Sequence, residues 1–314
     1  MQILRALQPK VQGRPPLCFN PGLIASGDGY LLFYRVQAHG EPFTSLARVQ
    51  LDRQFRATAA PVLLQIDRIS DQITSFEDPR AFLWRGEIWL MHNQASLVDG
   101  IWSTSLVIGR CSGDRIVDLS VPLYGRNENR ALDPAALPAF EKNWTPLVIG
   151  EDLFLIYEIN PMTVLKYDPL RRVWDLHKGP GEKIETGWPG YLSGSTPLIP
   201  WGEGQWLAMF HSYKSDGDRR LYTAGFWLLD AESWKVTALS PEPVLQGQRD
   251  RLRDLRAGRR RFLRYDPHYL VVFPCGLARD GTDLVVSLGL NDCQVALARF
   301  TEEEVNAALK PLAA

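Results

Sequence analysis

Polar residues that could bind a sugar or transfer a proton recur at one point of a repeated sequence pattern. Five segments share one order: a polar cluster, a proline, a short apolar run, a turn with glycine, and a second apolar run that ends in polar residues. The residues directly before the five prolines are Asn20, Asp78, Thr145, Thr196 and Phe273. The second runs end, about 14 residues further on or slightly more, at Arg35, His92 or Asn93, Glu158, His211 and Asp292. Carboxyl, guanidinium, imidazole and amide groups can hold sugar hydroxyls and carry out acid–base steps.

The repeat also predicts the elements that must position these residues. Short runs rich in Val, Ile, Leu, Phe, Tyr and Trp are interrupted by Gly, Asp and Pro, which is typical of strands joined by tight turns. Consecutive repeat prolines lie 58, 67, 51 and 77 residues apart, about one four-stranded blade each. We therefore predict an all-β fold, a five-bladed β-propeller, as a single domain over 1–314. Because proline cannot donate to a sheet ladder, each innermost strand is expected to begin at its proline.

A propeller would bring both residue sets to one end of the central channel. Equivalent positions of the inner strands surround a single axis, and each hairpin returns the chain to the same end. Two interpretations of the resulting ring stay open. It is either a sugar-binding site or a structural network that satisfies strand ends on an interaction platform.

The composition excludes several classes of partner. The 314 residues carry a formal net charge of -1, which gives no general attraction for nucleic acid or an anionic membrane. An Arg-rich stretch over 249–264 is either a solvated loop or helix face, or a clamp for phosphate or an acidic sugar. No apolar run approaches the roughly 20 residues that span a bilayer, and the N-terminus lacks the apolar core of a signal peptide. We expect a cytoplasmic protein.

Neither a metal nor a cofactor is predicted. The four cysteines stand far apart without a CxxC pair, so free thiols are expected. His92, His211 and His268 show no paired ligand spacing, and no Gly-rich phosphate loop occurs. Thr301 and Glu304 form a capping-box pattern that predicts a short C-terminal helix over 301–310 with a structural role.

The motifs that carry the repeat resemble a known family, glycoside hydrolase family 130, which contains mannoside phosphorylases and related mannosidases. The likeness covers most of the chain, from about residue 18 to 300. Its motifs are Phe19-Asn20-Pro21-Gly22 with Tyr34-Arg35, Glu77-Asp78-Pro79-Arg80, Glu141-Lys142-Asn143, Phe210-His211-Ser212-Tyr213, the strand from Tyr222 to Asp230, and Val272 to Gly276 with Gly289 to Asp292. A five-bladed propeller is also the fold that this resemblance implies.

The resemblance implies an inverting reaction on a β-mannoside or similar glycoside. Asp78 would protonate the leaving oxygen, relayed through the mannose 3-hydroxyl, while phosphate or water attacks from the opposite face. An acid that works near neutral pH needs a raised pKa, which Glu77 or Asp292 could supply as neighbouring carboxylates. Asn20, Arg35 and Asp292 would hold the sugar.

One departure from the family pattern bears on the nucleophile. Where the second phosphate-binding arginine is expected, this chain has Tyr157-Glu158-Ile159-Asn160. A carboxylate there repels phosphate, so hydrolysis is favoured over phosphorolysis, with Glu158 as the base that positions water. Two alternatives remain: a mannosyltransferase that uses a sugar-nucleotide or sugar-phosphate donor, and a non-catalytic propeller that binds glycans or proteins.

The candidate site residues fall into two groups. Asp78 and Glu158 are the predicted catalytic residues. The predicted substrate-binding residues are Asn20, Arg35, Glu77, Arg80, Lys142, Asn143, His211, Tyr213, Tyr222 and Asp292. An oligosaccharide or glycoside is the expected partner, with inorganic phosphate or a sugar nucleotide left open as the second substrate, and neither nucleic acid nor membrane is expected.

Overall fold

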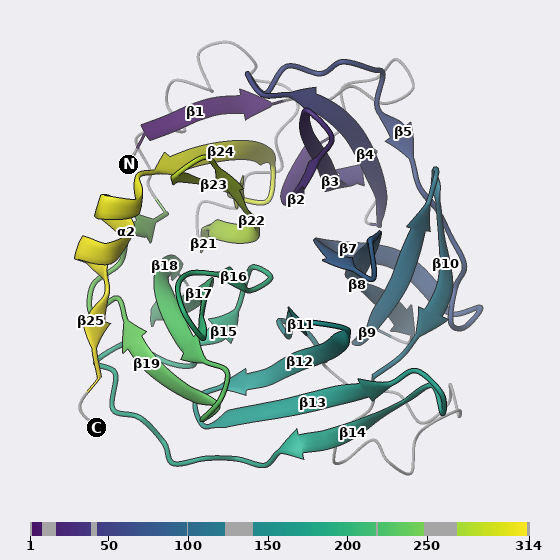
Figure 1. The fold of residues 1–314 in the computed structure, drawn as a ribbon. Coiled ribbons are helices and arrows are strands. Elements are labelled where there is room, and N and C mark those ends of the chain that lie inside the picture. The colour runs from purple at the N-terminus through teal and green to yellow at the C-terminus, as the bar shows by residue number, and fades with distance from the viewer. Residues whose placement is uncertain are drawn as a thin grey trace.

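Strands dominate the structure, which is a computed structural model that describes residues 2–7, 17–38, 43–98, 100–122, 141–217, 219–247 and 269–312. Within these residues the strands form five sheets, which stand around a central axis in the manner of a propeller (Figure 1). The predicted all-β, propeller-like arrangement is confirmed. The Arg-rich stretch 249–264 lies outside the described residues.

The first two sheets come from the N-terminal part of the chain. The first contains, in spatial order, β2 (Leu17–Ser26), β3 (Gly29–Gln37), β4 (Thr44–Asp52) and β5 (Val62–Leu63). The second contains β7 (Ile73–Trp84), β8 (Glu87–Val98), β9 (Ile101–Ser112), β10 (Arg115–Ser120) and β6 (Gln65–Ile66).

Three further sheets complete the ring. The third contains β11 (Thr145–Ile149), β12 (Asp152–Ile159), β13 (Met162–Asp168) and β14 (Val173–Lys178). The fourth is built on β15 (Ser193–Gly194), β17 (Gln205–Asp216), β18 (Arg219–Asp230), β19 (Lys235–Leu239) and β25 (Lys310–Pro311), with β16 (Ile199–Pro200), β20 (Leu245–Gln246) and β21 (Tyr269–Leu270) paired to it. The fifth contains β22 (Val272–Asp280), β23 (Asp283–Leu290), β24 (Gln294–Phe300) and β1 (Gln2–Leu7).

Hydrophobic side chains fill the junctions between neighbouring sheets. Each junction has its own buried cluster, because the strands are apolar on both faces and every sheet packs against the sheet on either side. Representative pairs across the five junctions are Leu32 with Val285, Leu31 with Leu90, Trp84 with Leu155, Phe154 with Trp227, and Phe226 with Val286. This packing fixes the sheets around the axis and therefore fixes the strands that line it.

Each end of the described chain adds a strand to a sheet that is formed by a distant part of the sequence. β1 pairs antiparallel with β24, and β25 pairs with β19 of the neighbouring sheet. Between β24 and β25 lies the helix α2 (Glu302–Ala308), and its capping box is confirmed by reciprocal hydrogen bonds of 3.1 Å between Thr301 and Glu304. No helix in the described ranges is long and apolar enough to cross a membrane.

The innermost strands do not begin at their prolines, so this prediction is wrong. Pro21, Pro79 and Pro274 lie inside β2, β7 and β22, several residues after each strand has started. Pro146 is the second residue of β11, and Pro197 lies between β15 and β16. The physical reason is that these strands lie at sheet edges, where a missing N–H interrupts no ladder on the open side.

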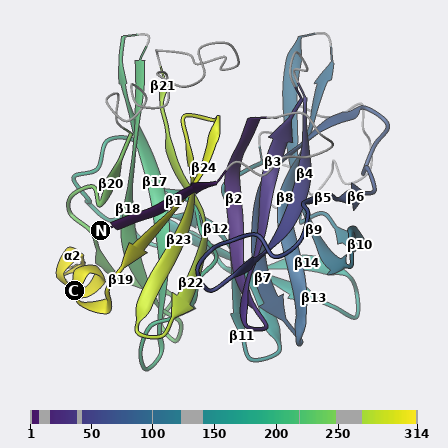
Figure 2. The same cartoon turned by 90° about the horizontal axis from the view of Figure 1, so that it is seen from above.

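Two long hairpins rise on either side of the axis. The β8–β9 and β17–β18 hairpins are built from strands of 12 residues, and Figure 2 shows both extending toward the same end of the molecule. His92 and Asn93 lie on the first hairpin, and His211 and Tyr213 lie on the second.

Candidate active site

Asn20 and Asp78 meet at the centre of the ring, as the repeat predicted. The Nδ2 of Asn20 donates to Oδ1 of Asp78 over 2.8 Å, although the residues are 58 positions apart. Both are buried, with 4% of Asn20 and 7% of Asp78 exposed. β2 and β7 pack closely enough that a Cβ on Gly22 would lie 2.4 Å from the carbonyl oxygen of Pro79, so glycine is required there.

The Asn-Pro and Asp-Pro pairs explain how these two side chains reach the axis. The register of β2 against β3 shifts between Phe19 and Gly22, and that of β7 against β8 shifts between Glu77 and Arg80. Proline disfavours the right-handed helical conformation for the residue before it, and here that residue is left-handed, with φ of 47° at Asn20 and 49° at Asp78. Asn and Asp adopt this conformation more readily than other side-chain-bearing residues. The resulting bulges redirect the side chains.

Positive φ is shared by several other residues of the site. Within the described residues, five of the ten non-glycine residues with positive φ belong to it: Asn20, Asp78, Asn143, Asn291 and Asp292. Such conformations are sparsely populated and cluster at functional sites.

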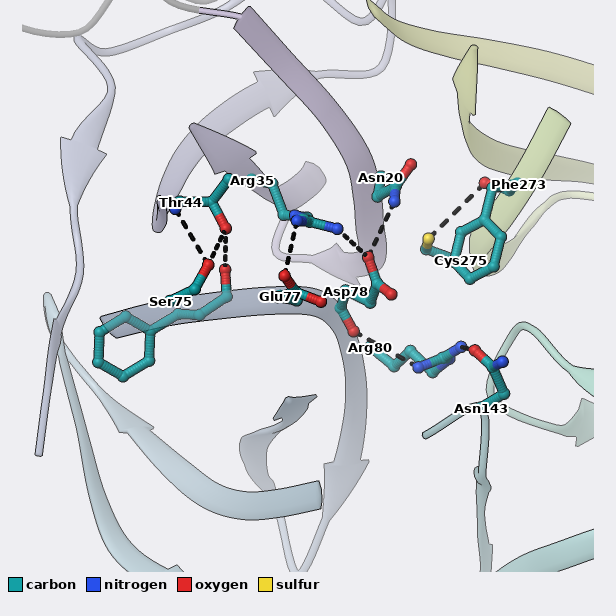
Figure 3. Close-up of polar contacts among 11 residues, drawn as sticks. Asn20, Arg35, Thr44, Ser75, Glu77, Asp78, Arg80, Asn143, Phe273 and Cys275 are labelled. Atoms are coloured by element: carbon teal, nitrogen blue, oxygen red, sulfur yellow. Dashed lines mark hydrogen bonds and ion pairs between the residues drawn. The ribbon is translucent and has the colours of Figure 1, made fainter. Parts of the chain in front are cut away.

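Arg35 binds two carboxylates at once. Its NH1 donates to Oδ1 of Asp78 and its NH2 to Oε1 of Glu77, both over 3.0 Å (Figure 3). The guanidinium also lies over the ring of Phe19, at 4.6 Å from its centroid. Burial acts to lower the pKa of Arg35, but the charges of Glu77, Asp78 and Asp292 outweigh it and raise that pKa, so Arg35 stays cationic.

Arg80 ties the site to the third and fourth sheets. The residue is 0% exposed, and its guanidinium donates to the carbonyl oxygens of Ser195, Gly194 and Asp78 and to Oδ1 of Asn143. The guanidinium of Arg80 therefore already donates its hydrogen bonds to acceptors within the protein. This arrangement fits a residue that positions Asp78 and Ser195 better than one that contacts the substrate directly.

Asp292 lies in the turn between β23 and β24, next to Asn20, Arg35 and Glu77. The preceding Asn291 anchors this turn, because its N–H donates to the carbonyl of Val271 and its Oδ1 accepts from the N–H of Val271, both over 2.9 Å. Asp292 remains open to solvent on one side while protein surrounds it on the others. Its carboxyl group is thus accessible to a ligand.

The pKa values of the two aspartates move in opposite directions. Burial acts to raise the pKa of Asp78, but Arg35, Arg80 and the hydrogen bond from Asn20 outweigh it, so the pKa lies below its ordinary value. Burial raises the pKa of Asp292, since the opposing charge of Arg35 is offset by Asp78 and Glu77. The expectation that Glu77 or Asp292 would raise the pKa of Asp78 is therefore wrong: two guanidinium groups outweigh the neighbouring carboxylates.

His211 and two tyrosines form a row of stacked rings on the β17–β18 hairpin. The ring of His211 is stacked on Tyr222 at 6.0 Å between centroids, and Tyr222 is stacked on Tyr213 at 5.4 Å. The row passes from buried His211, through half-buried Tyr222, to Tyr213, which is 43% exposed. An aromatic face that is open to solvent suits contact with a sugar ring.

The remaining predicted residues take different places. Lys142 is exposed, and its charge acts on both Asp78 and His211. Asn93 is buried and pairs in register with Glu77. Glu158 is exposed near the end of β12, and its carboxylate makes no hydrogen bond or ion pair with any described residue. Partial burial raises the pKa of Glu158. The structure thus groups Asp78 with Asn20, Arg35, Glu77 and Asp292, but leaves Glu158 out of this network.

Two contributors were missed by sequence reasoning. The ring of Phe19 packs against the guanidinium of Arg35, and Ser195 contacts both Arg80 and His211. Ser195 lies directly before Thr196 in the repeated pattern. This position in the sequence could have indicated that Ser195 belongs to the site. The four cysteines are free, as predicted, and Cys275 is buried beside Asp78 (Figure 3). The described residues contain no group of three or more His, Cys, Asp or Glu side chains that could hold a metal ion.

Comparison with known proteins finds a family model that matches part of the chain and solved structures that share its fold. The model of glycoside hydrolase family 130, described as beta-1,4-mannooligosaccharide phosphorylase, matches residues 182–310. This match confirms the resemblance over 182–310, and the motifs from Phe19 to Asn143 lie outside it. No curated protein sequence matches the chain.

Solved structures resemble the chain over nearly its whole length. A beta-1,2-mannobiose phosphorylase from Listeria innocua shares 15% identity at a TM-score of 0.61, with 96% of this chain and 94% of that chain covered. A GDP-Man-dependent mannosyltransferase from Leishmania mexicana shares 14% identity at 0.60, with 96% and 90% covered. A third structure, reported with family 130 glycoside hydrolases that target beta-1,2 mannosidic linkages in Candida mannan, shares 15% at 0.65, with 95% and 87% covered. At these identities the likeness shows the fold.

Proposed function

We propose that the chain is an enzyme that cleaves a β-mannoside or a similar glycoside with inversion, and that Asp78 is its acid–base group. The observation that carries this proposal is the position of Asp78. Its carboxyl group is nearly fully buried at the centre of the ring, where it is bonded to Asn20 and Arg35 from another sheet. The family match over 182–310 supports a mannoside as the substrate.

The groups around Asp78 have complementary parts in this reaction. Arg35 and Asn20 hold the Asp78 carboxyl group in place, and the accessible Asp292 accepts hydrogen bonds from sugar hydroxyls. In the cleavage direction Asp78 donates a proton to the leaving oxygen through the 3-hydroxyl of the sugar. The nucleophile bonds to the anomeric carbon from the opposite face as the glycosidic bond breaks, which inverts the configuration.

Water is favoured over phosphate as that nucleophile. Among the described residues, the two arginines whose charges act on Asp78 are Arg35 and Arg80, and both already donate to protein acceptors. Neither guanidinium is therefore available to bind a phosphate dianion. Glu158 is accessible, and a raised pKa suits a general base that must accept a proton near neutral pH.

The five sheets support the five-bladed propeller that the repeat predicted. Each sheet carries one of the five proline motifs on or beside its edge strand. We therefore propose one blade for each sheet, within a single domain over 1–314, so that all five blades contribute to the mouth of the site.

A second candidate function is mannosyl transfer to an acceptor hydroxyl. The observation that favours it is the lowered pKa of Asp78, which keeps this carboxyl group ionised. An ionised carboxylate can remove a proton from an acceptor, whereas cleavage requires the same group to be protonated first. The fold shared with a GDP-Man-dependent mannosyltransferase supports this alternative.

One assay separates these reactions. The protein is incubated with β-mannooligosaccharides, with and without inorganic phosphate, and separately with GDP-mannose plus the same oligosaccharides as acceptors. We expect free mannose at equal rates with and without phosphate. Product that forms only with phosphate, as mannose 1-phosphate, contradicts hydrolysis. Longer oligosaccharides that appear only with GDP-mannose show transfer instead.

A further inference from the structure

The imidazole of His211 is nearly fully buried beside the proposed active site. His211 is 3% exposed, and Phe273 packs on it with ring centroids 4.6 Å apart. Burial and the charge of Arg80 lower its pKa to about 3, while Asp78 acts to raise it and Lys142 acts to lower it further. The imidazole is therefore neutral at physiological pH and can exist as either of two tautomers.

Ser195 is the residue that distinguishes the two ring nitrogens. Its Oγ lies 2.7 Å from Nδ1 of His211, and the residue is 0% exposed. Its backbone is fixed on both sides: the N–H donates to the carbonyl of Met209, and the carbonyl accepts from Nε of Arg80. The preceding Ser193 and Gly194 pair with β17 directly at His211 and Phe210. The backbone that carries this hydroxyl is therefore fixed beside the ring.

The supply of acceptors decides which tautomer is favoured. A serine hydroxyl has one proton to donate, and Nδ1 of His211 is the acceptor that the described structure offers to it. If Nδ1 carried the ring proton instead, the proton of the fully buried Ser195 hydroxyl would have no partner. A proton on Nε2 costs less, because Nε2 is not among the fully enclosed atoms without a partner. Ser195 thus donates to Nδ1, and the ring proton resides on Nε2. Within the described residues, Nε2 makes no hydrogen bond, so it is available to a ligand.

We propose that Ser195 is a positioning residue that holds His211 in the Nε2–H tautomer, so that this histidine donates a hydrogen bond from Nε2 to an oxygen of the bound sugar. A neutral N–H donor of fixed direction suits a hydroxyl oxygen, which needs no charge to accept. The sugar as the ligand rests on the proposed function, whereas the tautomer and the role of Ser195 in setting it do not.

The tautomer is measured directly by nitrogen-15 NMR of the imidazole rings in the full-length protein, with the His211 signals assigned by their loss in His211→Gln. We expect the pattern of a neutral ring protonated at Nε2, unchanged between pH 5 and pH 8, and its change to a tautomer mixture in Ser195→Ala. The control Ser212→Ala removes another buried hydroxyl, one that donates to the carbonyl of Pro189 rather than to the ring. This control is expected to keep the wild-type pattern. A wild-type ring protonated at Nδ1, or an unchanged pattern in Ser195→Ala, overturns the proposal.

Ligand binding and turnover test the second half of the inference. Added mannose is expected to shift the Nε2 signal of the wild type, and an unshifted signal overturns the role in sugar binding while leaving the tautomer result to stand. Ser195→Ala is expected to lower kcat/KM by about 10-fold to 100-fold, the size seen when a metal-binding histidine loses its orienting partner. Ser195→Thr, which keeps the hydroxyl, should restore it, and Ser212→Ala should leave it unchanged. Full activity in Ser195→Ala contradicts the positioning role.

Discussion

Asp78→Asn is expected to slow glycoside cleavage by about 100-fold to 10,000-fold, the contribution that a positioned acid–base group typically makes. Asparagine has nearly the same shape as aspartate, and Arg35 retains its ion pair with Glu77, so the site should keep its arrangement. The variant loses the group that can donate or accept the proton. Product formation from a β-mannooligosaccharide, followed over time for both proteins, measures the effect.

Asp118→Asn is the matched control for this variant. Asp118 also has a positive φ, of 54°, and also pairs with an arginine, Arg110, over 2.9 Å. Its side chain is exposed on β10, away from the proline motifs. Its substitution should leave the rate unchanged. If Asp78→Asn cleaves as fast as the wild type, Asp78 is not the acid–base group.

Arg35→Met is expected to produce the largest loss of stability, about 3–5 kcal/mol in the free energy of unfolding at pH 7. Removing one partner of a buried ion pair leaves the other charge uncompensated, and here two carboxylates, Glu77 and Asp78, lose their common partner. Methionine preserves much of the apolar contact with Phe19, so the change isolates the charge. Urea unfolding followed by tryptophan fluorescence measures it.

The loss should depend on pH with a defined sign. In the wild type the pKa of Asp78 is lowered by Arg35, so its stabilising contribution is present above the ordinary value of 3.8 and is lost as the pH falls through the lower folded value. In Arg35→Met that contribution is absent at neutral pH. The difference between the two proteins should therefore be largest near pH 7 and should shrink below about pH 4, where the carboxyl groups become protonated.

Arg110→Met provides the control for this variant. Arg110 also binds two carboxylates, Glu87 and Asp118, over 3.0 and 2.9 Å, but these lie at the exposed surface. Exposed ion pairs contribute about 0–1 kcal/mol, so a small loss is expected. An equal loss in both variants would contradict the argument that burial makes Arg35 decisive.

The sequence repeat predicted much of the architecture because strands and turns depend mainly on local sequence. Proline motifs at regular intervals, followed by alternating apolar runs and glycine turns, predicted the propeller-like ring and the contact of Asn20 with Asp78. The start of each inner strand was misjudged because the cost of a proline depends on whether a strand lies at a sheet edge. That property belongs to the assembled sheet and cannot be deduced from the strand alone.

The pKa of Asp78 was harder to predict, because it also depends on the assembled structure. Sequence motifs indicated that carboxylates gather around Asp78, which suggested a raised pKa. The outcome depends on how far each group lies from Arg35 and Arg80, and on the hydrogen bond from Asn20. The contact of Ser195 with His211 joins the residue after β15 to β17, and only the register of these two strands brings the hydroxyl to Nδ1.

The configuration of the first product tests the central claim most directly. Proton NMR of the anomeric signals, recorded during the first minutes of reaction on a β-mannooligosaccharide, distinguishes α-mannose from β-mannose before they interconvert. Inverting cleavage at Asp78 predicts α-mannose from the wild type and a rate at least about 100-fold lower from Asp78→Asn. Initial release of β-mannose, or α-mannose formed equally fast by Asp78→Asn, would contradict it.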